Sequence, residues 1–282
     1  MSKQLQNILY APLGWFLHLL ALLPWWAIYA QADVLYFLVY HVLRYRRKIV
    51  RRNLRDSFPE KSDAELLAIE RESYHQFADY FMETIKQLHI TDDEMRRRMV
   101  FHGVEHIEDA LDRGRSVADI DYGQVYQPLE NEWFDRFFLN LRARFGTHCY
   151  PKRRIYLDMI RQIKKNGRQM VVGFLSDQHP LPNDEGHVIK FLNHPTAMIS
   201  GTEVIARRIG LSVVYFDVRK VSRGHYECTI VPICDDPATM PDGAITDAYA
   251  RLLEDRIKSA PAYWLWTHNR WKRPVQYPEG MA

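Results

Sequence analysis

The strongest constraint on this chain is an uncharged segment near its N-terminus. From Ile8 to Ala30 there are 23 residues without Asp, Glu, Lys or Arg, enough for a helix to cross about 30 Å of hydrocarbon. Pro24 predicts a kink in that helix, and a second apolar run, Val34 to Leu43, is too short to span alone. A cleaved signal peptide is disfavoured, because the run continues into Trp-Trp and basic residues. We therefore predict a membrane anchor over residues 1–43, either spanning or embedded in one leaflet.

A cluster of basic residues follows the anchor directly. Residues 1–60 contain eight Lys or Arg and three Asp or Glu, whereas the whole chain has a formal charge of only +3. Positive charge beside an apolar segment favours the cytoplasmic side of a membrane and contact with anionic head groups. A solvated helix face and nucleic-acid binding are the alternatives, and the neighbouring apolar segment argues against both. The residues expected to contact membrane or phosphate are Arg44, Arg46, Arg47, Lys48 and Arg51.

Residues 44–282 alternate between helical and strand-like patterns, which predicts one α/β domain with a central, mostly parallel sheet flanked by helices. Ser62 and Glu65 have the spacing of a capping box, and so do Ser200 and Glu203. The three cysteines have neither CxxC nor Cys/His metal spacing, so we expect no disulfide framework and no metal site. The expected helices lie at about 62–88, 104–113, 131–145, 153–165, 200–210 and 246–259, and the expected strands at 116–120, 123–127, 170–175, 211–218 and 226–233.

One junction does not fit the alternation. The strands expected at 116–120 and 123–127 are separated by two residues, whereas a parallel crossover needs a dozen or more. Either residues 121–123 form a hairpin turn, or a strand end and a helix are missing near residues 118–122. The second interpretation implies a lost segment of about 15 to 20 residues.

Several motifs, in this order and spacing, resemble the late acyltransferases of lipid A biosynthesis, a branch of the lysophospholipid acyltransferase superfamily. The resemblance covers nearly the whole chain. The matching stretches are residues 45–60, residues 123–146, Asp177-Gln178, residues 191–203 and residues 261–272.

The resemblance implies a glycerolipid-acyltransferase-like fold and an enzyme at the cytoplasmic face of a bacterial inner membrane. Such an enzyme transfers a fatty acyl chain from acyl carrier protein to a hydroxyl of a lipid A precursor or related glycolipid, with no metal or prosthetic group. Its expected partners are an anionic membrane, the lipid precursor and acyl carrier protein, and not nucleic acid. The residues expected to support the site or bind substrate are Arg144, Asp177, His268, Arg270 and Lys272.

The family's catalytic motif is absent from its expected place. In the family, a His followed after four residues by Glu or Asp supplies a general base and the carboxylate that orients it. Here Gly114 to Ala118 runs into Asp119 to Tyr122, at the junction where the alternation also fails. Two other His-x4-acid pairs exist, His89 with Glu94 and His179 with Asp184, and chance alone gives about 1.5 such pairs for 12 His and 35 acidic residues. His179 and Asp184 follow a strand end and are the better placed candidates.

Three hypotheses follow. The first is an active membrane-associated acyltransferase that depends on acyl carrier protein. The second is a catalytically inactive relative, a pseudoenzyme, that binds acyl-lipid or acyl carrier protein only. The third is that the sequence derives from a deletion in a longer gene whose intact product has the first function.

Overall fold

The computed structural model describes residues 3–112, 120–165, 169–180 and 187–277. It divides into two units. The first unit comprises residues 1–28, 83–100 and 104–175, and the second comprises residues 29–82, 101–103 and 176–282. The proposed boundary between an anchor and a catalytic domain at residue 43 stays a prediction.

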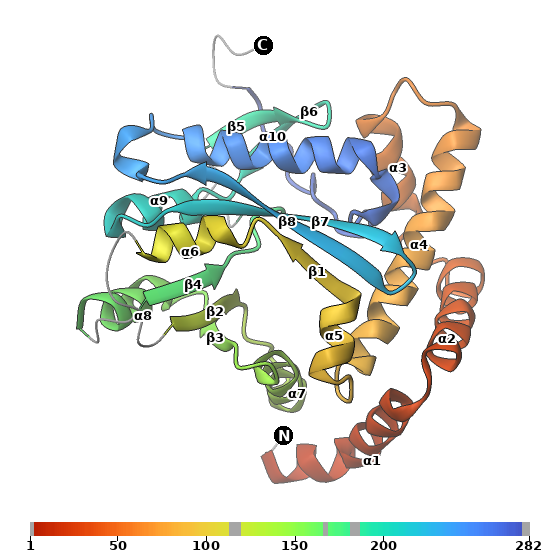
Figure 1. Cartoon of the computed structure of the whole chain (residues 1–282). Coiled ribbons are helices and arrows are strands. Elements are labelled where there is room, and N and C mark those ends of the chain that lie inside the picture. The colour runs from red at the N-terminus through yellow and green to blue at the C-terminus, as the bar shows by residue number, and fades with distance from the viewer. Residues whose placement is uncertain (1–2, 113–119, 166–168, 181–186, 278–282) are drawn as a thin grey trace. The chain divides into compact units, whose positions relative to one another are not determined.

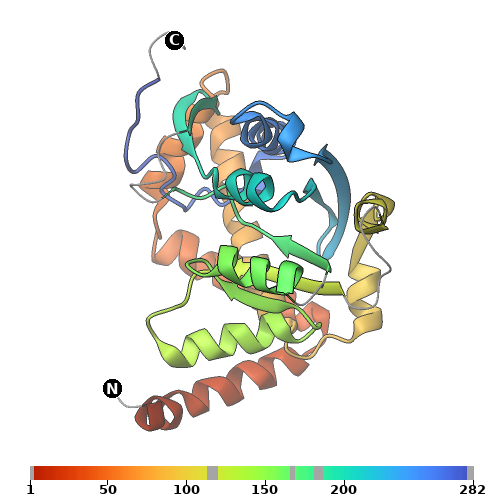
Figure 2. The same cartoon turned by 90° about the vertical axis from the view of Figure 1, so that its left-hand side faces the viewer.

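Two apolar helices begin the chain. Helix α1 spans Lys3–Leu22 and α2 spans Trp25–Phe37, so the chain is interrupted at Pro24, as the sequence predicts. In the first unit α1 runs beside α7 (Glu132–Ala143; Figure 2), with the Tyr10 and Trp133 rings 5.4 Å apart. The Lys86 ammonium donates to the carbonyls of Ala21 (2.9 Å) and Leu23 (2.8 Å). It thus satisfies carbonyl groups that a helix C-terminus leaves unpaired.

The predicted spanning helix is not confirmed. Among the described helices, none is both long and apolar enough to cross a membrane by itself; residues 25–42 and 47–57 meet that requirement only as a pair bent by 88°. Helices α1 and α2 and the residues that follow α2 still expose many large apolar side chains. The exposed ones are Leu9, Trp15, Phe16, Leu19, Leu22, Trp26, Val34, Phe37, Leu38, Val42 and Leu43.

A parallel sheet forms the centre of the first unit (Figure 2). Its strand order is β3 (His148–Pro151), β2 (Ile120–Tyr126) and β4 (Gln169–Gly173), and β2 is parallel to both neighbours. The alternative of a hairpin turn at residues 121–123 is wrong, because β2 is one continuous strand through that position. The strand expected at 116–120 lies outside the described residues except for Ile120. Helix α8 (Ile155–Ile160) continues as a π-helical turn over Arg161–Lys165.

The main sheet of the second unit is largely antiparallel. Strands β7 (Val213–Ser222) and β8 (His225–Cys234) form a long hairpin, and β1 (Met99–His102), whose second half belongs to this unit, follows in the order β1-β8-β7. Helix α10 (Ala244–Ser259) lies along the hairpin (Figure 1), where Arg256 pairs with Asp217. The expectation of a mostly parallel sheet therefore holds only for the sheet of the first unit.

A short hairpin and a helix follow the Asp177 segment. Strands β5 (His187–Phe191) and β6 (His194–Met198) are antiparallel, and their turn at Leu192 and Asn193 has φ values of 47° and 64°. Helix α9 (Gly201–Ile209) follows, but Ser200 makes no side-chain cap, so the predicted capping box at 200–203 is wrong. Glu203 instead accepts from the backbone N–H groups of Gly243 and Thr246. The sequence pattern did not reveal this role because both donors lie some 40 residues downstream.

The remaining helices are α3 (Arg47–Ser57), α4 (Asp63–Lys86), α5 (Asp92–Arg98) and α6 (Glu105–Asp112), with a π-helical turn at Leu38–Val42 and 3-10 turns at Pro237–Thr239 and Pro261–Tyr263. The capping box at Ser62 and Glu65 is confirmed, since the Glu65 carboxylate accepts from the Ser62 N–H at 2.8 Å and the Ser62 hydroxyl accepts from the Glu65 N–H at 3.3 Å. The core of the second unit includes Tyr40, Val50, Leu54, Phe58, Tyr74, Phe191, Leu192, Met198, Ala250, Ile257 and Trp266.

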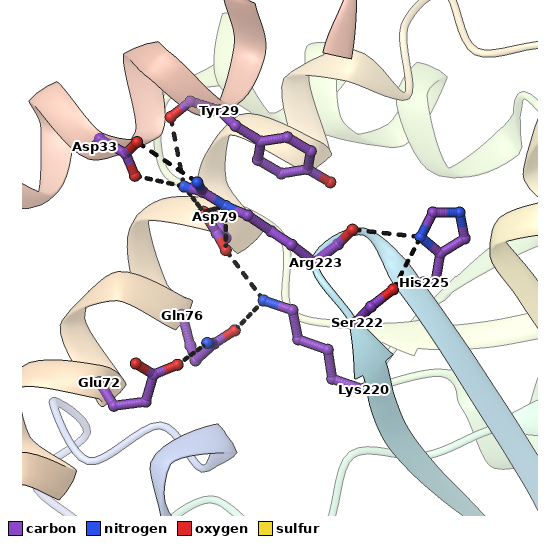
Figure 3. A network of polar contacts seen from close by, with 9 residues as sticks. All are labelled: Tyr29, Asp33, Glu72, Gln76, Asp79, Lys220, Ser222, Arg223 and His225. Carbon is purple, nitrogen blue, oxygen red and sulfur yellow. Dashed lines mark hydrogen bonds and ion pairs between the residues drawn. The ribbon is translucent and has the colours of Figure 1, made fainter. Parts of the chain in front are cut away.

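An ionic network centred on the buried Asp79 joins the tip of the β7–β8 hairpin to α4 and α2 (Figure 3). Asp79, which is 3% exposed, accepts from Lys220 at 3.0 Å and from Arg223 at 2.6 Å. Arg223 also donates to Asp33 at 2.6 Å. Burial alone would lower the pKa of Arg223, but its bonds to Asp79 and Asp33 outweigh that effect and raise it. Every charge in this network therefore has a partner of opposite sign.

Candidate functional site

The C-terminal segment, residues 261–273, is bound in the second unit by side chains of the basic stretch, residues 45–60. The side-chain amide of Asn53 donates to the carbonyls of Trp266 and His268, both at 3.2 Å. Arg46 donates to the Thr267 carbonyl at 3.0 Å. Trp266 itself is 1% exposed. Two of the family-like stretches, residues 45–60 and residues 261–272, thus pack against each other.

The Asp177 segment meets the same aromatic stretch. The Trp264 indole N–H donates to Asp177 Oδ2 at 3.2 Å, and the His179 backbone N–H donates to His268 Nε2 at 3.2 Å. His268 lies 89 residues after His179 in the sequence, and the fold brings it to the segment that carries Asp177 and His179. This cluster, with Arg270 beside it, is the candidate functional site of the second unit.

Arg270 is the unusual member of the cluster. Its side chain is 2% exposed, and it donates from Nη2 to the Ala197 carbonyl at 2.5 Å and to Met198 Sδ at 3.4 Å. Its Nε atom has no hydrogen-bond partner, and no ion pair involves it within the described part of the chain. Burial lowers the pKa of Arg270 to about 10, an effect that the charge of Asp177 and the Tyr249 hydroxyl only partly oppose. A buried guanidinium without an ion-pair partner costs folding free energy. Its N–H groups can donate to an anion or to a polarised carbonyl oxygen of a ligand.

Both histidines of the cluster use their ring nitrogens within the protein. Burial, reinforced by the charge of Arg270, lowers the pKa of His268, and its Nε2 accepts the His179 backbone N–H. His179 Nδ1 lies 2.8 Å from the Pro180 carbonyl oxygen and 3.1 Å from Nη2 of Arg273. Arg273 also donates to His179 Nε2 at 3.1 Å. A guanidinium on the lone pair blocks the atom that would take a substrate proton, which weakens His179 as a base. Asp184, its predicted partner, lies outside the described residues.

The other predicted residues are bound elsewhere or exposed. Arg144 belongs to the first unit, where its guanidinium binds the carbonyls of Gln87 and Ile90 at the end of α4. Lys272 is exposed. His89 does not pair with Glu94: its Nε2 lies 3.0 Å from Nδ1 of His18, while Glu94 binds Arg98 at 3.3 Å.

The basic segment is only partly available for phosphate. Arg47 and Arg51 both bind Glu70, at 2.9 and 2.7 Å, and Glu70 is 2% exposed. Arg44, Arg46 and Lys48 are exposed on the same segment. A pocket of about 260 Å³ opens beside it and is lined by Arg51, Leu54, Arg55, Asp63, Leu66, Leu67 and Glu70.

One pair of residues was missed by sequence reasoning. In the first unit His148 Nδ1 contacts Asp121 Oδ1, and neither residue had been singled out. The available signal was an acidic residue inside a strand-like run, but its partner depends on the register of β2 and β3. Among the residues with a described position, no group of three or more His, Cys, Asp or Glu side chains is arranged to hold a metal ion.

The family model for bacterial lipid A biosynthesis acyltransferases matches residues 5–118 and 120–273. The chain belongs to this family. The lipid A biosynthesis lauroyltransferase of Escherichia coli (strain K12) is 27% identical over 284 residues, covering 93% of this chain and 91% of the relative. A palmitoleoyltransferase of E. coli K12 and a lipid A biosynthesis acyltransferase of Shigella flexneri are each 26% identical over 254 residues, covering 83% of this chain and 81% of either relative.

The comparisons also bear on the junction near residue 119. The family match breaks between residues 118 and 120. Because 93% of 282 residues is about 262, the 284-residue alignment with the lauroyltransferase leaves about 22 positions without a residue of this chain. The alignment with the palmitoleoyltransferase leaves about 20 by the same arithmetic. The loss of about 15 to 20 residues near residues 118–122 stays a prediction.

Proposed function

We propose that this chain is a membrane-associated acyltransferase that transfers a fatty acyl chain from acyl carrier protein to a lipid A precursor. The observation that carries the proposal is the family match over residues 5–273, broken only at residue 119. The convergence of Asp177, His268 and Arg270 supports it, because these residues come from two family-like stretches and surround one another. The thioester of the donor supplies the activated acyl group, so the reaction needs no metal or prosthetic group.

The surface chemistry fits a lipid acceptor. Arg44 and Lys48 are exposed next to the apolar helices, where cations attract the phosphates of an anionic membrane or of the acceptor. The exposed apolar side chains of α1 and α2 would enter the lipid, placing the chain at the cytoplasmic face of a bacterial inner membrane. Arg270 would hold the carbonyl oxygen or a carboxylate of the bound lipid.

A second candidate function is favoured by one observation, the missing His-x4-Glu motif together with about 20 unmatched alignment positions. A chain without a base would bind acyl-lipid or acyl carrier protein and transfer nothing. This candidate differs from the first in turnover and not in binding.

The deciding experiment is acyl transfer from labelled acyl-acyl carrier protein to a purified lipid A precursor by membranes that contain the full chain. We expect transfer above the level of membranes without it. A second protein, with a His-x4-Glu strand-and-helix segment inserted after Ala118, is assayed in parallel. Transfer by the inserted protein alone would contradict the first function and establish the second.

Membrane attachment has its own test. Replacing Arg44 and Lys48 with Glu should lower binding of the chain to anionic liposomes, because each basic residue near the surface contributes about 1 kcal/mol. Arg47 is left in place because it binds Glu70. The same charge change at the exposed Arg96 and Arg97 of α5 is the matched control. Equal binding by both variants would contradict the assigned contact.

A further inference from the structure

The first unit contains a His–Asp pair in the arrangement of a general base. Residues i and i+2 of a strand face the same side of a sheet. Asp121 and Gly123 of β2 therefore share a face with His148 and Tyr150 of β3, because Gly123 is aligned with His148 and Val125 with Tyr150. On this face Asp121 Oδ1 contacts His148 Nδ1, and Tyr150 donates its hydroxyl to Asp121 Oδ2 at 2.5 Å.

The burial of the pair is asymmetric. Asp121 is 4% exposed, whereas the His148 side chain is 64% exposed. A buried carboxylate that accepts from Nδ1–H fixes the tautomer of the imidazole and leaves the Nε2 lone pair directed away from it. Both carboxylate oxygens are occupied, so Asp121 has no freedom to rotate. Nε2 is the ring nitrogen that does not contact Asp121, and it belongs to a side chain that is mostly exposed.

The position of Tyr150 depends on a glycine. A Cβ atom at Gly123 would lie 2.6 Å from Cε2 of the Tyr150 ring. Any other residue at that position would displace the ring, and with it the hydroxyl that fixes Asp121. The residues Asp121, Gly123, His148 and Tyr150 thus form one preorganised unit, which we term the β2–β3 dyad.

We propose that the β2–β3 dyad is a general-base site of this chain, with His148 as the catalytic residue and Asp121 and Tyr150 as positioning residues. The inference rests on the proposed acyl transfer. Asp121 lies two residues beyond the break in the family match, so the dyad arises where the family motif is missing. It occupies the N-terminal ends of β2 and β3, whereas a strand-end motif occupies the C-terminal ends, so it is a new site and not the displaced old one.

The step balances with an acyl thioester and a hydroxyl acceptor. His148 Nε2 takes the proton of the acceptor hydroxyl as that oxygen attacks the thioester carbonyl carbon and forms the ester C–O bond. The C–S bond then breaks, and the leaving thiolate receives the proton from the imidazolium. Water in place of the lipid hydroxyl gives thioester hydrolysis by the same steps, which provides an assay that does not require the lipid.

The test measures thiol release from acyl-acyl carrier protein by the full-length chain in detergent, with and without a lipid A precursor. His148→Gln should lower the rate about 100-fold or more, the usual effect of removing a general base. Asp121→Asn should lower it as well, while circular dichroism reports whether the buried substitution leaves the fold intact. The matched control is His187→Gln, since His187 Nε2 also contacts a carboxylate, Asp247 Oδ1 at 2.7 Å, but ties β5 to α10 in the second unit.

The outcomes separate the two proposals. Rates for His148→Gln within threefold of the wild type overturn the dyad and leave the acyltransferase proposal intact. No thiol release by the wild type, with lipid and acyl carrier protein still bound, overturns the dyad and supports the binding-only function. Equal losses for His148→Gln and His187→Gln also overturn the dyad, because they show a general destabilisation.

Discussion

Lys220 and Arg270 are both buried cations of the second unit, and their surroundings differ. Lys220 has a side chain 5% exposed and donates to Asp79 at 3.0 Å, beside Arg223, within a network in which each charge is compensated (Figure 3). Arg270 is 2% exposed and donates to a carbonyl and a sulfur atom, and its Nε has no partner.

The difference separates a structural role from a functional one. A buried ion pair that loses one partner leaves an uncompensated charge, so the Asp79 network resists change. An unpaired buried cation lowers the stability of the fold, but its N–H donors remain usable by a ligand atom. We therefore assign the Asp79 network to holding the β7–β8 hairpin and Arg270 to the candidate site.

The largest expected effect is at Asp79. Asp79→Ala leaves Lys220 and Arg223 without their shared carboxylate and should lower the free energy of unfolding by about 3–5 kcal/mol. Urea denaturation followed by circular dichroism measures the change. Lys220→Met is the control, because Asp79 keeps Arg223 and the loss should be smaller. Losses of equal size in both variants would contradict the shared role of Asp79.

A loss of unfolding free energy of intermediate size is expected at the capping box of Ser62 and Glu65. Ser62→Ala removes the acceptor of the Glu65 N–H and should cost about 1 kcal/mol of unfolding free energy. The same denaturation experiment reports it. Glu60→Ala, at an exposed position just before the helix, is the control and should change stability by less than about 0.5 kcal/mol.

A smaller change in stability is expected at Arg270. Arg270→Met removes a buried charge as well as the bond to the Ala197 carbonyl, and these effects oppose each other. The free energy of unfolding should stay within about 1 kcal/mol of the wild type. Acyl transfer, in contrast, should fall at least tenfold. A loss of stability like that of Asp79→Ala, with transfer retained, would reverse the assignment of the two cations.

The smallest effect concerns pH. Burial lowers the pKa of His268 below its ordinary value of 6.5, so the unfolded chain binds more protons than the folded chain just below pH 6.5. The contribution of this group to stability is present above pH 6.5 and is lost as the pH falls through the folded pKa. His268→Gln should therefore reduce the fall in melting temperature between pH 7.5 and 5.5. His89 and His194 also have pKa values lowered by burial, so part of the fall should remain.

The sequence predicted those parts of the fold that depend on local pattern. The capping box at Ser62, the break at Pro24 and the helices before Gly146 and Gly210 follow from residues a few positions apart. The β5–β6 hairpin was missed because its turn requires a positive φ at Leu192, a residue that rarely adopts it. Glu203 was misassigned as a cap because its partners come from the start of α10.

The candidate site was predicted to a similar extent. Asp177, His268 and Arg270 were found from the order of family-like stretches, which spacing along the chain can reveal. The sequence did not reveal that Arg273 donates to the His179 ring or that Arg144 binds the carbonyls of Gln87 and Ile90. Both contacts depend on how distant segments pack against each other. The pairing of Asp121 with His148 depends on the register of β2 against β3, which the sequence pattern does not contain.

The contact of Lys86 with the end of α1 has a consequence for synthesis on the ribosome. The carbonyls of Ala21 and Leu23 bind the ammonium of Lys86, which is synthesised more than 60 residues later. At about 5–20 residues per second, that delay is about 3–13 s. During this interval the apolar helix has left the translation machinery without its own cap, and it is open to any factor or surface that captures nascent apolar helices.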